Sequence, residues 1–287
     1  MSYGIDHQVG DEASPKETYN GNAKDTCGYA PVNGLKMYFE IEGTGEPLVF
    51  IPPVFEHAGM HTFRALVRNH SVITVDLQGH GRTADIPDRP ISFDQHAKDV
   101  VGLLDYLGIK NADFFGHSWG GVIATLIAVR YPRVVRRVAT FGATFGALQT
   151  AVKEQVLRAN LTQDGHAMQF KRENYKRVAP DPNYWPKFWD KALANQWTGF
   201  TKEELASVNA PLLIVLGDDD FVRLEHAVEA RELIPTAELA VIPDAGHFAP
   251  HSEPERVIPV VQHFLEKPER RAPIGTAESG YIPGKTR

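Results

Sequence analysis

One stretch, residues 114–121, constrains the fold of this chain more than any other. It reads Phe-Phe-Gly-His-Ser-Trp-Gly-Gly, so an apolar run of strand type ends in Gly-x-Ser-x-Gly and a small-residue helix pattern follows at once. Such a tight turn holds Ser118 in strained backbone geometry, and flanking glycines let the strand and the helix approach each other. The pattern predicts a serine hydroxyl at the carboxyl end of a strand. The N-terminus of the following helix would favour negative charge there.

Apolar runs alternate with helical patterns on both sides of this turn. Asn33-Gly34 lies between two of these runs, which is the strongest short-range signal for a β-hairpin. The runs at residues 47–51 and 72–75 are short and apolar, as in buried strands of a sheet, and further strand-like runs lie at residues 112–115, 134–141, 211–216 and 238–242. Strands that alternate with helices form a mostly parallel sheet. We therefore predict an α/β fold, a three-layer α/β/α sandwich with eight strands.

The spacing of apolar residues and the capping residues predict helices between these strands. Ser92 and Gln95 form a capping box at the start of a helix that ends near Leu107. The last helix starts near Ser252, and Pro259 is expected to kink it. Other predicted helices span residues 60–69, 119–131, 148–161, 166–177, 184–194 and 224–233.

The alternation stops between residues 142 and 208, where helical patterns are rich in aromatic residues and hold three of the four tryptophans. We predict that residues 142–208 form a helical cap on a core made of residues 28–141 and 209–267. The polar residues 1–27 are predicted to be a flexible N-terminal arm, with a strand-like arm as the alternative. Residues 268–287 are charged and rich in glycine and proline, and are predicted to be a loose tail.

Composition excludes several classes of function. The net charge of −6 comes without a basic stripe, which argues against nucleic acid as a partner. No run approaches the roughly 20 apolar residues of a membrane-spanning helix, and no apolar segment typical of a secretory signal is present near the N-terminus. Cys27 is the single cysteine, so no intrachain disulfide can form. These features predict a cytoplasmic protein that binds neither nucleic acid nor membranes; a homodimer is left open.

A serine nucleophile needs a general base, and histidine suits that task near neutral pH. In a parallel sheet, catalytic groups gather just past the carboxyl ends of strands. His247 follows a predicted strand through a short glycine-containing loop and is our candidate, with His251 as the alternative. His117 is next to the serine, where neighbouring side chains diverge. It is interpreted mainly as a packing residue, although it is also kept among the candidate substrate contacts.

The base needs a carboxylate that fixes its tautomer. Three aspartates, residues 218–220, follow the predicted strand 211–216. Asp220 is our candidate, and the other two are interpreted as cap or turn residues. No acidic residue follows the strand that ends near Phe141, which removes the main alternative position.

The order Ser118, Asp220, His247 and the motifs around them resemble the α/β-hydrolase fold superfamily over residues 28–267. The loop at residues 76–83 resembles the D-x-x-G-x-G-x-S/T loop that is common in this superfamily. The resemblance implies a serine hydrolase similar to esterases and lipases, with a helical cap.

An oxyanion hole would need two backbone N–H donors. One would come from Trp119, the residue after the nucleophile. The second normally comes from a His-Gly-x loop after an early strand, but this chain has Pro52-Pro53 there, and proline has no N–H. Val54 is therefore the predicted donor, with Phe55 as the alternative.

Serine in this turn predicts an acyl-enzyme on a carbonyl substrate. We predict hydrolysis of an ester, a lactone or a related acyl bond of a small, partly apolar molecule, without metal or cofactor. The same triad serves carbon–carbon bond hydrolases, aminopeptidases and perhydrolases, and some members of this fold act as small-molecule receptors with slow turnover. The candidate substrate contacts are Phe55, His117, Phe145, Trp185, Trp189 and Phe248.

Overall fold

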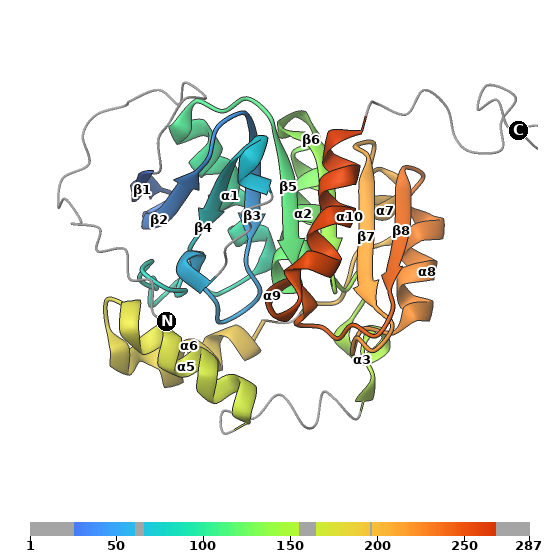
Figure 1. Ribbon diagram of the computed structural model, residues 1–287. Coiled ribbons are helices and arrows are strands. Elements are labelled where there is room, and N and C mark those ends of the chain that lie inside the picture. The colour runs from blue at the N-terminus through green and yellow to red at the C-terminus, as the bar shows by residue number, and fades with distance from the viewer. Residues whose placement is uncertain (1–25, 61–65, 155–164, 196, 268–287) are drawn as a thin grey trace, which may run out of the picture.

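Eight strands form one sheet in the part of the chain that this computed structural model describes, residues 26–60, 66–154, 165–195 and 197–267 (Figure 1). Their order across the sheet is β1-β2-β4-β3-β5-β6-β7-β8. The strands are β1 (Thr26–Val32), β2 (Leu35–Glu42), β3 (Glu46–Ile51), β4 (His70–Val75), β5 (Ala112–His117), β6 (Val135–Phe141), β7 (Leu212–Gly217) and β8 (Ala237–Ile242). From β4 to β8 all neighbours are parallel, so the predicted mostly parallel, eight-stranded sheet is confirmed.

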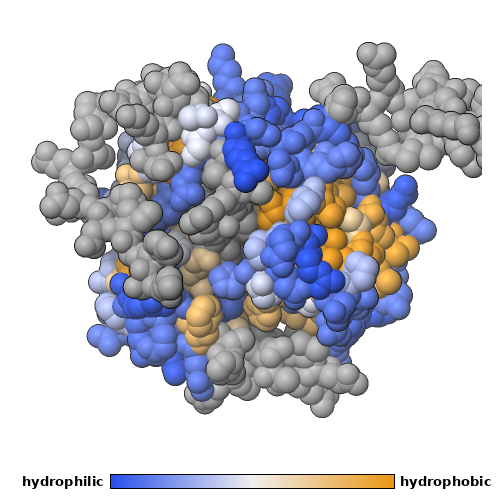
Figure 2. All heavy atoms as spheres, viewed as in Figure 1, coloured by the Kyte–Doolittle hydropathy of each residue, from blue (hydrophilic) through white to orange (hydrophobic). Residues whose placement is uncertain are grey.

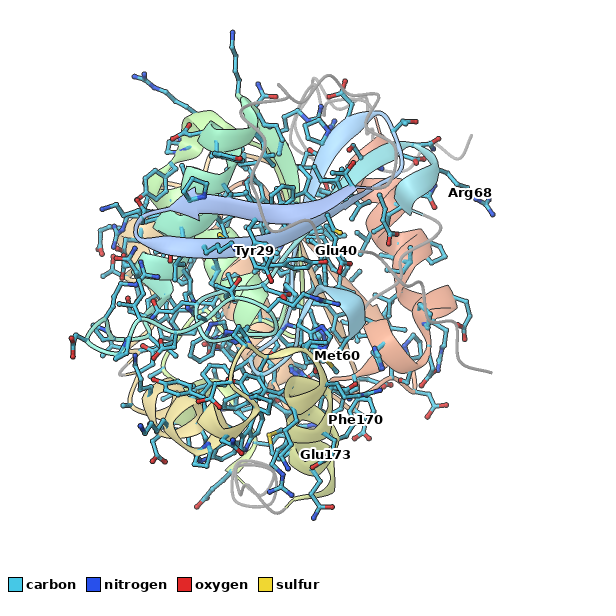
Figure 3. All side chains as sticks on the ribbon, turned by 90° about the vertical axis from the view of Figure 1, so that its left-hand side faces the viewer. Tyr29, Glu40, Met60, Arg68, Phe170 and Glu173 are labelled. Carbon is cyan, nitrogen blue, oxygen red and sulfur yellow. The ribbon has the colours of Figure 1, made fainter. Side chains whose placement is uncertain are left out.

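The predicted hairpin is also confirmed at the antiparallel edge of the sheet. β1 pairs with β2 through a two-residue turn in which Asn33 and Gly34 have φ values of 47° and 85°. Both values lie in the left-handed region that a hairpin turn of this length requires. Figure 3 shows this hairpin, with Tyr29 and Glu40 labelled, crossing one side of the molecule above α5. Residues 26 and 27 of the predicted arm belong to β1, whereas residues 1–25 and 268–287 lie outside the described residues.

Helices cover both faces of the sheet and complete the predicted three layers. One face packs against α1 (Phe93–Leu107), α2 (Trp119–Arg130) and α8 (Leu224–Leu233). The other face packs against α9 (Ala249–Ser252) and α10 (Pro254–Glu266), and α10 continues through Pro259. Figure 2 shows an apolar area over β7 and β8 beside α10, near the sheet edge where Val241 is exposed. No helix within the described residues is long and apolar enough to span a bilayer.

An insert of helices joins β6 to β7. It contains α3 (Leu148–Ala151), α5 (His166–Val178), η4 (Pro182–Tyr184), α6 (Trp185–Leu193) and α7 (Lys202–Ala206). Helices α5 and α6 lie beyond the carboxyl ends of the central strands (Figure 1). Their aromatic side chains form a separate apolar cluster with Phe55, which follows β3. The insert therefore packs on the core through its own small core, and the boundaries of the predicted cap remain a prediction.

Two predicted elements differ in detail. Two 3₁₀ turns, η1 (Ala58–Met60) and η2 (Leu66–Arg68), lie where the helix 60–69 is predicted to begin and to end, and residues 61–65 lie outside the described range. Residues 155–161 of the helix predicted at 148–161 lie outside the described range as well. Only half of the predicted capping box forms. Ser92 Oγ accepts the Gln95 N–H at 3.2 Å, but the Gln95 amide donates to Asp99 at 2.9 Å because that buried carboxylate needs donors.

Candidate active site

Ser118 lies in the turn between β5 and α2 with a φ of 54°, which a residue with a side chain rarely adopts. The turn is held because the Ser118 N–H donates to the Phe141 carbonyl at 2.7 Å. A Cβ at Gly116 would overlap the Gly120 carbonyl, and one at Gly120 would overlap the carbonyl of Ile51. Both glycines of Gly-x-Ser-x-Gly are therefore required by backbone contacts, as the sequence indicated.

The side chains of His247 and Asp220 form a hydrogen-bonded, buried pair. His247 Nδ1 lies 2.8 Å from Asp220 Oδ1, which also accepts the Val222 N–H at 2.9 Å. Asp220 follows β7 and His247 follows β8, so two adjacent parallel strands bring them together. Nδ1 of the imidazole thus faces the carboxylate, which can accept a hydrogen bond from it. The other two aspartates of the run, residues 218 and 219, are exposed, and so is His251.

Three neighbours pack closely around His247. His117 Nε2 lies 2.8 Å from the His247 carbonyl oxygen, and the Phe221 ring lies over the imidazole with centroids 3.7 Å apart. A Cβ at Gly142 would lie 2.6 Å from His247 Nδ1 and 3.0 Å from Asp220 Oδ2. His117 is thus a buried support of the histidine loop and is not among the described residues that line the cavity, and its contact with substrate remains a prediction.

The two predicted oxyanion donors line the same cavity as Ser118. Trp119 is the first residue of α2, so its N–H has no acceptor within the helix. Its indole Nε1–H donates to His96 Nδ1 at 3.2 Å, which anchors the ring. Val54 follows two prolines, and the next residue, Phe55, has a φ of 67°. The chain therefore reverses direction sharply at this loop, beside Ser118.

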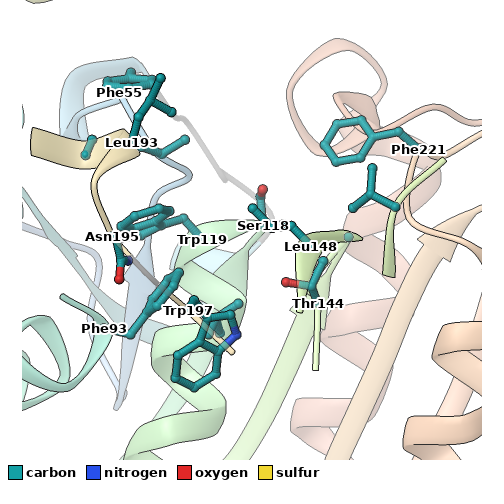
Figure 4. Close-up of a pocket in the computed structure, with 15 residues that line it drawn as sticks. Phe55, Phe93, Ser118, Trp119, Thr144, Leu148, Leu193, Asn195, Trp197 and Phe221 are labelled. Carbon is teal, nitrogen blue, oxygen red and sulfur yellow. The ribbon is translucent and has the colours of Figure 1, made fainter. Parts of the chain in front are cut away.

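The cavity has a volume of about 180 Å³ and is predominantly apolar. In Figure 4, Ser118 lies between a wall that includes Trp119, Phe93 and Trp197 and a wall with Leu148 and Phe221. Among the residues that the structure describes, the lining also includes the hydroxyl of Thr144 and the amide of Asn195, and none of these described lining residues is charged. This arrangement suits an apolar, uncharged molecule with a reactive group at Ser118.

Of the six predicted substrate contacts, the lining includes Phe55. Trp185 and Trp189 lie within the aromatic cluster of the insert, where Trp189 stacks on Phe55 with centroids 4.9 Å apart. Phe145 is buried beside His226, and Phe248 is 38% exposed on the surface. Trp185 and Trp189 thus pack the insert against the core, and contact of these four rings with substrate remains a prediction. No sequence pattern marked Thr144, Asn195 or Trp197 as lining residues.

Buried polar groups support the loop that follows β4. Asp76 accepts the N–H groups of Ala58 at 2.7 Å and Arg82 at 2.8 Å, while its burial raises the pKa of its carboxyl to about 7. Burial lowers the pKa of His80 to about 4 and lowers that of His96 well below its ordinary value. Both imidazoles are therefore neutral at pH 7.

Comparison with known proteins agrees with this fold. The model of the alpha/beta hydrolase family matches residues 48–260. An uncharacterized protein of Mycobacterium tuberculosis is 26% identical, with 86% of this chain and 83% of that protein covered. The sn-1-specific diacylglycerol lipase ABHD11 of Mus musculus is 28% identical, with 68% and 71% covered. The solved structure of Est816, an N-acyl homoserine lactone degrading enzyme, is 27% identical with a TM-score of 0.65, and 81% and 98% are covered. This chain belongs to the alpha/beta hydrolase family.

Proposed function

We propose that this protein is a serine hydrolase that cleaves an ester or lactone of a small, uncharged, apolar molecule through an acyl-enzyme. The observation that carries the proposal is that the strained Ser118 follows β5 and the buried His247–Asp220 pair follows β7 and β8, so that all three lie at the carboxyl edge of one parallel sheet. In this proposal Ser118 is the nucleophile, His247 the general base and Asp220 the group that orients the base.

The chemistry would proceed in two steps. Ser118 Oγ attacks the carbonyl carbon while His247 Nε2 takes its proton, and the N–H groups of Trp119 and Val54 donate to the resulting oxyanion. The leaving alcohol takes that proton from His247 as its bond to the acyl carbon breaks. Water then attacks the acyl-enzyme with His247 as base, and releases the acid and Ser118.

The lining of the cavity supports an uncharged substrate. Placing a carboxylate among apolar side chains without a partner costs several kcal/mol, and the lining residues within the described ranges include no charged side chain. The names of two relatives, a diacylglycerol lipase and an N-acyl homoserine lactone degrading enzyme, agree with an acyl substrate of this kind.

Hydrolysis of p-nitrophenyl esters of increasing acyl length tests the proposal. Wild type is expected to turn over repeatedly, and the Ser118→Ala variant to lose at least about 10³-fold in kcat/KM. p-Nitrophenyl butyrate and the p-nitrophenyl half-ester of succinate have similar size and differ in charge, so the butyrate should be preferred. Turnover by Ser118→Ala at the wild-type rate would refute the serine mechanism, and a single burst without turnover would favour a receptor.

A further inference from the structure

Lys171 of α5 lies buried where the insert meets the loop that follows β3. Its Nζ lies 2.8 Å from Glu56 Oε1 and donates to the Val54 carbonyl at 3.0 Å. Both charged side chains are only 6% exposed, and the ring of Phe248 covers the ammonium at 5.6 Å. Desolvation offsets most of the attraction in a buried ion pair, so such a pair is weak support for stability. Stability alone therefore does not explain why this ion pair lies at the loop after β3.

That loop carries Val54, the proposed second oxyanion donor. Lys171 donates to the carbonyl of Val54, the same residue whose N–H is the proposed donor. It also forms an ion pair with Glu56, two residues further along the chain. Pro53 restricts the chain before Val54, and Phe55 holds a left-handed conformation after it. The ammonium thus contacts two residues of the turn that the Glu56 N–H closes by donating to the Pro53 carbonyl at 3.2 Å.

We infer that Lys171 is a positioning residue that holds the Val54 N–H in line with the oxyanion; this inference rests on the proposed function. Hydrogen-bond donors in an oxyanion hole act by being fixed in place before the charge develops, so their alignment affects the transition state more than the ground state. Loss of Lys171 should therefore lower kcat and leave KM nearly unchanged. The same contact makes the donor depend on the docking of α5.

The chain offers a matched control in a second lysine that ties the insert to the core. Lys191 of α6 lies 2.5 Å from Asp85 Oδ2, and it donates to the carbonyls of Ile86 and Pro87 at 2.9 and 3.2 Å. The Asp85 side chain is 2% exposed, so the acidic member of this ion pair is buried as well. The hydrogen bonds and ion pair of Lys191 are to residues 85–87 and not to the loop that carries Val54. Removing it weakens the docking of the insert without touching the proposed donor.

The experiment compares kcat and KM of wild type, Lys171→Met, Lys171→Arg and Lys191→Met on p-nitrophenyl butyrate. Lys171→Met is expected to lose about 10- to 100-fold in kcat with KM changed less than about threefold, and Lys171→Arg to recover part of the loss. Lys191→Met should keep kcat within about threefold of wild type. Equal kcat for Lys171→Met and wild type would overturn the inference, and so would equal losses in the two methionine variants.

A double variant separates positioning from folding. Lys171→Met removes the ammonium that lies 2.8 Å from the buried Glu56 carboxylate, whereas Glu56→Gln/Lys171→Met removes both charges and should recover part of the melting temperature. Its kcat should stay low because the Val54 carbonyl still lacks its donor. Recovery of kcat together with the melting temperature would overturn the inference. Ser118→Ala activity equal to wild type would instead refute the proposed function.

Discussion

His117 Nε2 lies 2.8 Å from the carbonyl oxygen of His247, so the residue directly before Ser118 supports the loop that carries the proposed base. The carbonyl can only accept, so the imidazole of His117 is the donor. This contact links the end of β5 to the loop after β8. The positions of the nucleophile and the base are therefore coupled through one buried side chain.

Replacing His117 tests this link. His117→Leu removes the donor but keeps an apolar side chain in a buried position, and we expect kcat on p-nitrophenyl butyrate to fall about tenfold or more. His117→Gln keeps an N–H donor and should retain more activity than leucine. Equal kcat for the leucine variant and wild type would show that the contact does not position the base.

Gly142 tests the packing around the proposed dyad. A Cβ there would lie 2.6 Å from His247 Nδ1, and the φ of Gly142 is 59°. Gly108 provides the control, because its φ is 73° and a Cβ there meets nothing within 4 Å. Alanine at either position should cost about 1–2 kcal/mol of stability through the left-handed backbone. Only Gly142→Ala should also abolish most esterase activity; matching activities in the two variants would contradict the described dyad.

The hydrogen bond from the Trp119 indole to His96 makes a prediction about stability. His96→Leu leaves the indole N–H without an acceptor, and this should lower the free energy of unfolding by about 1–3 kcal/mol. His96→Gln keeps an acceptor oxygen and should lose less. Urea denaturation followed by tryptophan fluorescence measures both, and an equal loss in the two variants would argue against the hydrogen bond.

Buried His80 makes the stability depend on pH. Burial lowers its pKa to about 4 in the folded protein, whereas the unfolded chain titrates near the ordinary value of 6.5. Below that value the unfolded chain binds a proton that the folded protein does not, so this contribution is lost as pH falls from 6.5 to 4. As pH falls over this range, the free energy of unfolding of wild type should decrease relative to that of His80→Gln by up to about 3 kcal/mol. A difference that does not change with pH would contradict the assignment.

The sequence predicts those parts of the fold whose cause is local. Gly116 and Gly120 are needed because backbone atoms approach them, and Asn33-Gly34 because a two-residue hairpin requires positive φ. The pairing of Asp220 with His247 follows from their positions after adjacent strands of a parallel sheet. Their catalytic roles stay a prediction that the experiments above test.

The cavity could not be predicted because its walls depend on how distant segments dock. Trp185, Trp189 and Trp197 are all tryptophans of the insert. The rings of Trp185 and Trp189 pack against Phe55, and of these three residues only Trp197 lines the cavity. Lys171 is one of several basic residues of α5, and no sequence pattern distinguishes it from the others. Its partner Glu56 lies far away in sequence, and only packing of the insert brings them together.

Labelling with a fluorophosphonate tests the central claim most directly, because this reagent modifies a serine only where a base activates it and an oxyanion site receives the phosphoryl oxygen. Intact mass and peptide mapping should show one phosphonyl group per chain, on the peptide that contains Ser118. Labelling should be absent in Ser118→Ala and much slower in His247→Gln, and loss of esterase activity should follow the labelled fraction. Two results would contradict the account. One is an active esterase that stays unlabelled after treatment with the reagent, and the other is labelling at a residue other than Ser118.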